Sequence, residues 1–166
     1  SWTVDSFGVS IAAHEWGNPD HPPILLAHGG FDFAETFDRF APLLADQGRR
    51  VLSWDQRGHG DSEHVALYSW DADLRDAVSV MDTVSTEPMP VLGHSKGGGL
   101  MMSLAEIRPD RVSAVINLDG LPSKRSMPDI ADRERTKLMV QDLTNRFDFR
   151  RRAHTEVRRP GTLEEL

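Results

Sequence analysis

Residues 91–99 read VLGHSKGGG, and we predict the fold of the chain from this stretch. A short apolar strand ends at Gly93, Ser95 follows at a sharp corner, and a helix with a glycine-rich first turn comes next. A serine at such a corner is exposed only if the residues two before and two after it are small. The helix N-terminus favours negative charge on the serine oxygen. We predict that Ser95 is a nucleophile; the alternative is a glycine-rich turn with an ordinary N-cap serine.

Apolar runs and helical patterns alternate on both sides of this corner. The apolar runs are continuous, which is typical of parallel strands covered by helices on both faces. The sequence therefore predicts an α/β fold with a doubly wound, mostly parallel sheet. An antiparallel hairpin over residues 6–16 is expected at the edge of the sheet. The expected strands are 24–27, 51–54, 91–92 and 112–118, and the expected helices are 34–47, 71–84 and 96–108.

The character of the sequence changes after residue 120, and we predict two units, 1–120 and 121–166. Residues 1–120 carry 8 basic and 18 acidic side chains, whereas residues 121–166 carry 11 and 8. Charged helical patterns separated by prolines fill the second part. The basic side chains of residues 150–152 and 158–159 have acidic neighbours and no series of aromatic residues. We therefore expect a solvated helix face there and no nucleic-acid partner.

Composition limits the classes of protein that the chain resembles. Hydrophobic residues make up 39% and charged residues 27% of the chain, which is typical of a soluble globular protein. No apolar stretch reaches 18 residues and no signal peptide is visible, so we expect no membrane partner. The chain has no cysteine, which excludes disulfides and thiolate metal sites and suits a cytoplasmic location.

A second glycine-rich segment, residues 28–31 (HGGF), follows the first expected parallel strand. A loop at this place brings a backbone N–H towards Ser95, and acyl transfer needs two N–H donors for the oxyanion. We predict that the N–H groups of Gly30 and Lys96 form this oxyanion hole, with Phe31 as the alternative to Gly30.

Residues 55–62 (DQRGHGDS) form a polar, glycine-punctuated loop after the next expected strand. The loop lacks the Gly-Lys-Ser/Thr ending of a phosphate-binding loop, and we predict neither a cofactor nor a metal. His59 in this loop, and His28 before it, are expected to have structural roles. We predict that Phe31 and His94 line the substrate pocket.

Taken together, residues 28–30, 55–62 and 93–98 resemble the α/β-hydrolase fold family in order and spacing. The pattern is similar to the branch that contains esterases, lactonases, C–C bond hydrolases and cofactor-free haloperoxidases. The resemblance covers residues 1–120 and implies that residues 121–166 begin a helical cap, inserted after the sixth strand. Family members with aspartate at the nucleophile position include haloalkane dehalogenases and epoxide hydrolases, and Ser95 argues against both chemistries.

A serine nucleophile needs a base and an orienting carboxylate, and the resemblance implies the chain order serine, acid, histidine. His154 is the only histidine after Ser95, and it lies in the expected cap, so we do not expect it to be the base. Asp119 is a candidate acid at the end of the sixth expected strand; the alternative is a polar turn residue.

Residues 162–165 have the capping-box pattern that opens a helix, directly before the last residue. Ending the sheet at its sixth strand would also leave an unpaired apolar edge. We therefore expect a second chain or a further C-terminal segment to complete the sheet and to supply the histidine and the acid, and we expect the 166 residues alone to be inactive. The alternative is a truncated, inactive protein.

The expected function is that of a serine hydrolase acting on a carboxylic ester or related acyl group of a small hydrophobic substrate. Two alternatives remain open because fold does not fix function. One is a cofactor-free haloperoxidase or C–C bond hydrolase, and the other is a non-catalytic module that binds a small ligand.

Overall fold

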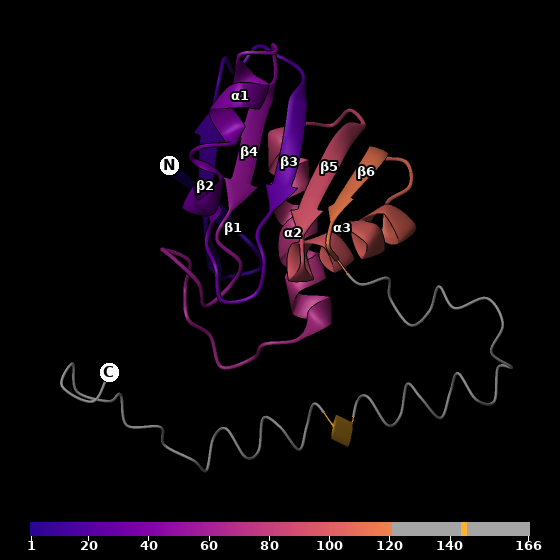
Figure 1. Cartoon of the computed structure of the whole chain (residues 1–166). Helices are drawn as coiled ribbons and strands as arrows, with labels where there is room; N and C mark the ends of the chain where they lie inside the picture. Colours follow the sequence, from indigo (N-terminus) through magenta and orange to yellow (C-terminus); the bar gives the residue numbers. More distant parts are fainter. Residues whose placement is uncertain (121–143, 146–166) are drawn as a thin grey trace, which may run out of the picture. The chain divides into compact units, whose positions relative to one another are not determined.

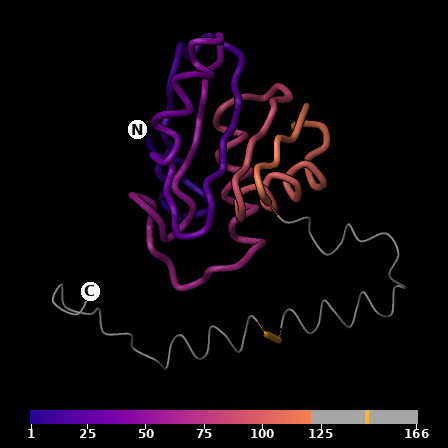
Figure 2. Tube along the Cα trace, viewed as in Figure 1, coloured from indigo at the N-terminus to yellow at the C-terminus, as the bar shows by residue number. Residues whose placement is uncertain are grey.

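The structure, a computed structural model, describes residues 1–120 and 144–145. Its centre is a six-stranded sheet with the order β1-β2-β4-β3-β5-β6 (Figure 1). The carboxyl ends of the four parallel strands lie at the same end of this sheet, which we call its carboxyl edge (Figure 1). Figure 2 traces the path of the chain in the same view. The predicted α/β fold with a mostly parallel sheet is confirmed. The parallel strands are β3 (Pro23–Ala27), β4 (Arg50–Trp54), β5 (Met89–His94) and β6 (Val112–Leu118).

An antiparallel hairpin forms one edge of the sheet. It consists of β1 (Trp2–Asp5) and β2 (Ser10–Trp16), and β2 also pairs antiparallel with β4. The hairpin was expected over residues 6–16, and it begins earlier because the short strand at the N-terminus buries Val4. Phe7 and Gly8 turn the chain at φ 54° and 83°.

Two helices cover one face of the sheet: α2 (Trp70–Val84) and α3 (Lys96–Ile107). The amphipathic pattern predicted a helix over 71–84, and α2 confirms it. Ser69 caps this helix, because its side chain accepts the Ala72 N–H at 3.1 Å. The buried side of α2 packs with strands β1 to β5 in the larger hydrophobic core, which includes Ile11, Leu25, Leu52, Val80, Met81 and Val91.

The expected single helix over residues 34–47 is wrong. The chain instead forms η1 (Ala34–Phe37), a turn of 3-10 helix, and α1 (Ala41–Ala45), a short α-helix. Pro42 lies inside the expected helix, and proline lacks the N–H that a helix interior needs but fits the first turn of a new helix. The break also changes which side chains are buried: Phe37 of η1 is buried, whereas Phe40 and Leu43 are exposed.

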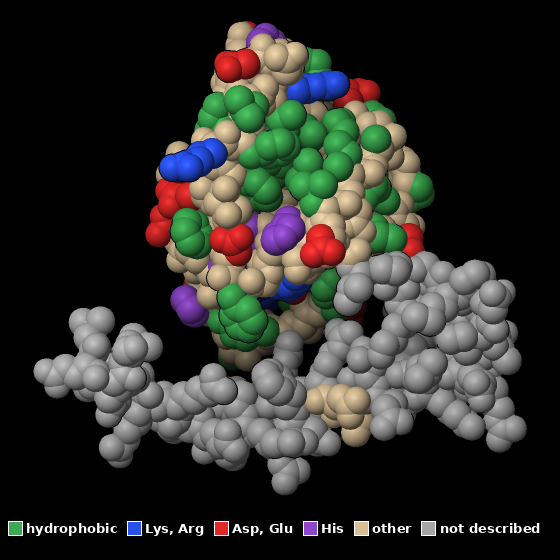
Figure 3. Space-filling view, in the orientation of Figure 1, with side chains coloured by type: hydrophobic (Ala, Val, Ile, Leu, Met, Phe, Trp, Pro, Cys, Tyr) green, Lys and Arg blue, Asp and Glu red, His purple; other side chains and the backbone are tan. Residues whose placement is uncertain are grey.

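The second face of the sheet is covered only in part by the described residues. Side chains of η1 and α1 pack there against β3, β4 and β5 in a smaller core. Strand β6 pairs with β5 alone, so its other edge is open within residues 1–120. Figure 3 shows hydrophobic side chains gathered on the surface seen in the orientation of Figure 1. The large exposed apolar residues of β6 are Val115, Ile116 and Leu118.

The chain separates into two units, Ser1–Ser123 and Lys124–Leu166. The expected cap, residues 121–166, lies outside the described residues except for 144–145, so the boundary at residue 120 and the cap stay predictions. Among the described residues, no helix is long and apolar enough to cross a membrane. The cytoplasmic location also stays a prediction.

Candidate active site

Ser95 occupies the corner between β5 and α3 that the sequence predicts. Its backbone has φ 51° and ψ −115°, which is strained for a residue with a side chain, and its N–H donates to the Leu118 carbonyl of β6 at 2.9 Å. Ser95 and its neighbour His94 are both exposed to solvent. The corner therefore presents the serine to solvent at the carboxyl edge of the sheet, although its role as nucleophile stays a prediction.

Glycines around Ser95 allow three backbone segments to meet. A Cβ on Gly93 would overlap the backbone of Gly97, and a Cβ on Gly97 would overlap the carbonyl groups of Ala27 and His28. Gly98 packs against the turn at the end of β6, because a Cβ there would lie 2.9 Å from the Cα of Gly120. Close packing thus explains glycines in a helix start that they would otherwise destabilise.

The loop after β3 lies against the corner, as predicted. A Cβ on Gly29 would lie 3.1 Å from His94 Nδ1 and 3.6 Å from Ser95 Cβ, and a Cβ on Gly30 would lie 4.0 Å from Lys96 Cβ. The structure thus brings Gly30 and Lys96 together beside Ser95. Whether their N–H groups form the oxyanion hole stays a prediction.

Phe31 follows this loop in an unusual conformation. It has φ 61° and is fully exposed, at 103% of the reference area. A bulky residue at positive φ is rare. The turn of the loop therefore sets the backbone conformation at this position, against the intrinsic φ preference of phenylalanine. Within the described residues, Phe31 and His94 both lie exposed next to the corner, which is compatible with the predicted pocket lining and does not test it.

His28 is a structural residue, as its position in the loop suggested. Its Nε2 accepts the backbone N–H of Gln56 at 2.9 Å, and its Nδ1 lies 2.7 Å from the Gly29 carbonyl. The neutral ring with the proton on Nδ1 satisfies both contacts. Burial is the main cause that lowers the pKa of His28 to about 4, and the nearby His59 adds to the effect. With both ring nitrogens engaged, His28 has none free to accept the Ser95 proton.

Asp55 organises the loops at the carboxyl edge, a role that the sequence did not reveal. This buried side chain accepts the Ala34 N–H at 2.7 Å and the Asp61 N–H at 2.9 Å. His14 of β2 approaches it at 3.5 Å. Because the partners lie on three different segments, the only signal in the sequence was an aspartate directly after a strand in a loop rich in glycine.

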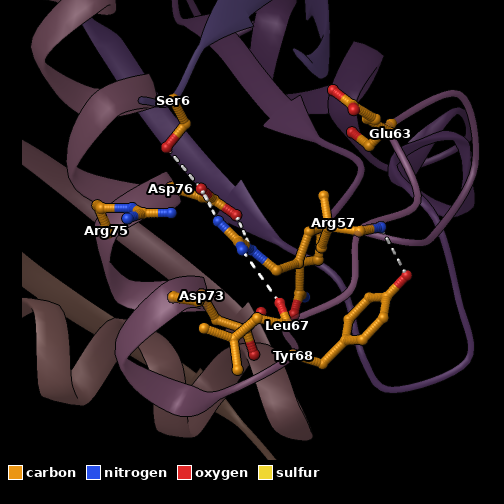
Figure 4. A network of polar contacts seen from close by, with 12 residues as sticks. Ser6, Arg57, Glu63, Leu67, Tyr68, Asp73, Arg75 and Asp76 are labelled. Carbon is orange, nitrogen blue, oxygen red and sulfur yellow. Dashed lines mark hydrogen bonds and ion pairs between the residues drawn. The ribbon is translucent and has the colours of Figure 1, made fainter. Parts of the chain in front are cut away.

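A buried ion pair joins the same loop to α2 (Figure 4). The Arg57 guanidinium donates two hydrogen bonds of 2.6 Å to the carboxylate of Asp76, and Ser6 Oγ donates to the same carboxylate at 2.5 Å. Arg57 also donates to the Leu67 carbonyl at 3.3 Å. The hydrogen bonding that Arg57 donates to the Asp76 carboxylate is the main cause that raises the pKa of Arg57. This network fixes the β4–α2 loop on which His59 lies.

Asp119, the candidate acid, lies in a turn directly after β6. It has φ 56° and is exposed. The side chain of Asn117 closes this turn by accepting the Gly120 N–H at 2.8 Å and donating to the Gly120 carbonyl at 3.1 Å. No hydrogen bond joins Asp119 to a histidine within residues 1–120. The geometry is that of a polar turn residue, and the role of Asp119 as an acid stays a prediction.

Within the described residues, no histidine forms a hydrogen bond with Ser95, so this part of the chain places no base at the predicted nucleophile. His154 lies outside the described residues. The described residues also contain no group of three or more His, Asp or Glu side chains that could hold a metal ion.

A sequence profile described as the alpha/beta hydrolase fold matches residues 22–157. The chain belongs to the α/β-hydrolase fold family. Solved structures of the family agree with this fold. The thioesterase domain from the curacin biosynthetic pathway superimposes with a TM-score of 0.67 at 31% identity, over 69% of this chain and 42% of that one.

Two curated relatives illustrate the range of the α/β-hydrolases that are similar to this chain. An sn-1-specific diacylglycerol lipase of Mus musculus is 36% identical over 64% of this chain and 35% of the lipase. Epoxide hydrolase A of Mycobacterium tuberculosis is 34% identical over 80% of this chain and 42% of that enzyme. The chain thus spans roughly two fifths or less of these α/β-hydrolases.

Proposed function

We propose that this α/β-hydrolase is a serine hydrolase that cleaves a carboxylic ester or related acyl group of a small hydrophobic substrate. One observation carries the proposal: a solvent-accessible serine sits at a strained strand-to-helix corner, with Gly30 and Lys96 beside it. The start of α3 adds its positive dipole end at the same place. Backbone strain of this kind persists only where the surrounding structure holds it, and it clusters at functional sites.

In the proposed reaction, Ser95 Oγ attacks the carbonyl carbon while a base takes the hydroxyl proton. The N–H groups of Gly30 and Lys96 stabilise the oxyanion. The alcohol then leaves with that proton, and water hydrolyses the acyl-serine ester to release the acid and restore Ser95.

A serine suits acyl chemistry better than epoxide opening. Attack of Ser95 Oγ on an epoxide carbon would form an ether, and water in an aqueous site at neutral pH does not hydrolyse an ether. Acyl transfer forms an ester, which the same site can hydrolyse. We therefore propose acyl hydrolysis, although one similar protein is named an epoxide hydrolase.

We propose that the base, and the acid that orients it, come from a further segment or from a second chain. Two observations support this: the described residues place no histidine at Ser95, and β6 has an open edge with exposed apolar side chains. An added strand would pair that edge and cover those side chains.

Covalent labelling of Ser95 by a fluorophosphonate tests the proposal, because only an activated serine reacts. The native gene product should be labelled and should hydrolyse p-nitrophenyl esters, and Ser95→Ala should abolish both. The 166-residue chain alone should show neither reaction. Lack of labelling in the native gene product would instead favour a non-catalytic ligand-binding module. Labelling without ester turnover would point to the C–C hydrolase or haloperoxidase branch, which a substrate panel then separates.

A further inference from the structure

Helix α2 carries two buried carboxylates one turn apart, Asp73 and Asp76. Each contacts a cation from a different segment at the carboxyl edge of the sheet. Asp76 binds Arg57 of the β4–α2 loop, and Asp73 lies next to that pair in Figure 4. Asp73 Oδ2 in turn lies 3.0 Å from Lys96 Nζ at the start of α3. Residues three apart share one face of a helix. One face of α2 is therefore tied to both the polar loop and the serine corner.

A contact made by the Lys96 side chain can restrict the backbone at the Ser95 corner. It directly follows Ser95 and is the first residue of α3, and three glycines come after it. Within this first turn, Lys96 alone has a side chain that reaches another element. Its backbone N–H is one of the two proposed oxyanion donors, and its Cβ lies beside the other donor, Gly30.

Asp73 depends on Lys96 as its direct ionic partner among the described residues. The side chain of Asp73 is 9% exposed and that of Lys96 is 29% exposed. Arg57 also attracts Asp73: the hydrogen bond to Asp76 is the main cause that raises the pKa of Arg57, and the charge of Asp73 adds to it. The guanidinium is nevertheless committed to Asp76 through two hydrogen bonds.

We propose that Asp73 is a positioning residue for the oxyanion hole and acts through the side chain of Lys96. The inference rests on the proposed function. An oxyanion donor is effective only when its peptide is held in one orientation before the charge develops. The ion pair ties the donor residue to a helix that is anchored in the larger core. It also holds the ammonium group on α2, away from the acyl group and from a carboxylate product.

A double-mutant cycle in the native gene product tests this role, with kcat and KM measured for a neutral p-nitrophenyl ester. Asp73→Asn should lower kcat about tenfold and leave KM nearly unchanged, because the oxyanion exists only in the transition state. In a Lys96→Met background, which keeps the backbone N–H, the same substitution should change kcat less than about twofold. Asp71→Asn is the matched control, because Asp71 is an exposed acid in the same first turn of α2.

Equal losses with and without the Lys96 side chain would overturn the proposal, since Asp73 would then act on α2 alone. An equal loss in Asp71→Asn would also overturn it, because helix-dipole charge would explain the effect. If the wild-type protein neither turns over nor is labelled, the proposed function fails, and the positioning role is judged by NMR. The order parameter of the Lys96 amide should then fall from about 0.85 towards about 0.6 in Asp73→Asn only. An unchanged order parameter refutes the role.

Discussion

Protonation of His28 should make the stability of this protein depend on pH below neutrality. The folded protein holds the ring between the Gln56 N–H and the Gly29 carbonyl, so a proton on Nε2 would face another donor. Burial, more than any charged neighbour, lowers the pKa to about 4. In the unfolded chain the ring is solvated and titrates near its ordinary value of about 6.5.

The unfolded chain therefore binds more protons than the folded protein between about pH 6.5 and pH 4. Stability from this group is fully present above about pH 6.5 and is lost as the pH falls towards 4. A pKa difference of roughly 2.5 units corresponds to about 3 kcal/mol in total. About 2 kcal/mol of this should be lost between pH 7.5 and pH 5.0.

Urea unfolding followed by the fluorescence of the four tryptophans measures this loss. His28→Gln keeps an acceptor for the Gln56 N–H but cannot titrate. The variant should be less stable than wild type at pH 7.5, and its free energy of unfolding should fall about 2 kcal/mol less on going to pH 5.0. His64→Gln, at an exposed histidine, is the control and should keep the wild-type pH dependence. The reasoning is refuted if His28→Gln and wild type lose the same free energy.

Three further predictions concern stability and labelling. Gly97→Ala should cost about 3 kcal/mol by overlap with backbone carbonyls, whereas Gly30→Ala has space and should cost less than about 1 kcal/mol; equal costs in urea unfolding would contradict this. Asp76→Asn should cost about 3–5 kcal/mol, because it leaves the buried Arg57 charge unpaired, and a thermal scan showing a negligible shift would argue otherwise. Ser95→Gly should raise the free energy of unfolding by about 1 kcal/mol through relief of strain at φ 51°, and should abolish fluorophosphonate labelling.

The sequence predicted those parts of the fold that depend on neighbouring residues. The corner at Ser95 was predictable because a strand, a serine and glycines at fixed offsets lie within residues 91–99. Helix α2 was predictable from its apolar period alone. The period over residues 34–47 misled because Pro42 interrupts the backbone hydrogen bonds that a continuous helix needs.

Contacts between distant segments were not predictable from one sequence. Asp55 holds loops that begin after different strands, and Asp73 reaches a lysine on another helix. Each aspartate looked like an ordinary polar residue in a loop or on a helix surface. Only the folded chain shows that they are buried and which cations or N–H groups they face.

Contacts within residues 1–120 explain how the corner at Ser95 can be ordered without a base. Strain at Ser95 is held by the Leu118 carbonyl, by glycine packing beneath the corner and by the turn that Asn117 closes. All of these groups lie within residues 1–120, so the conformational cost of the corner is met by the folding of that unit. A histidine supplied by a further segment or a second chain would then have to approach only a solvent-accessible, already oriented serine. Assembly of the proposed active site therefore requires that this segment or chain dock at the open β6 edge, and it does not require the corner to refold.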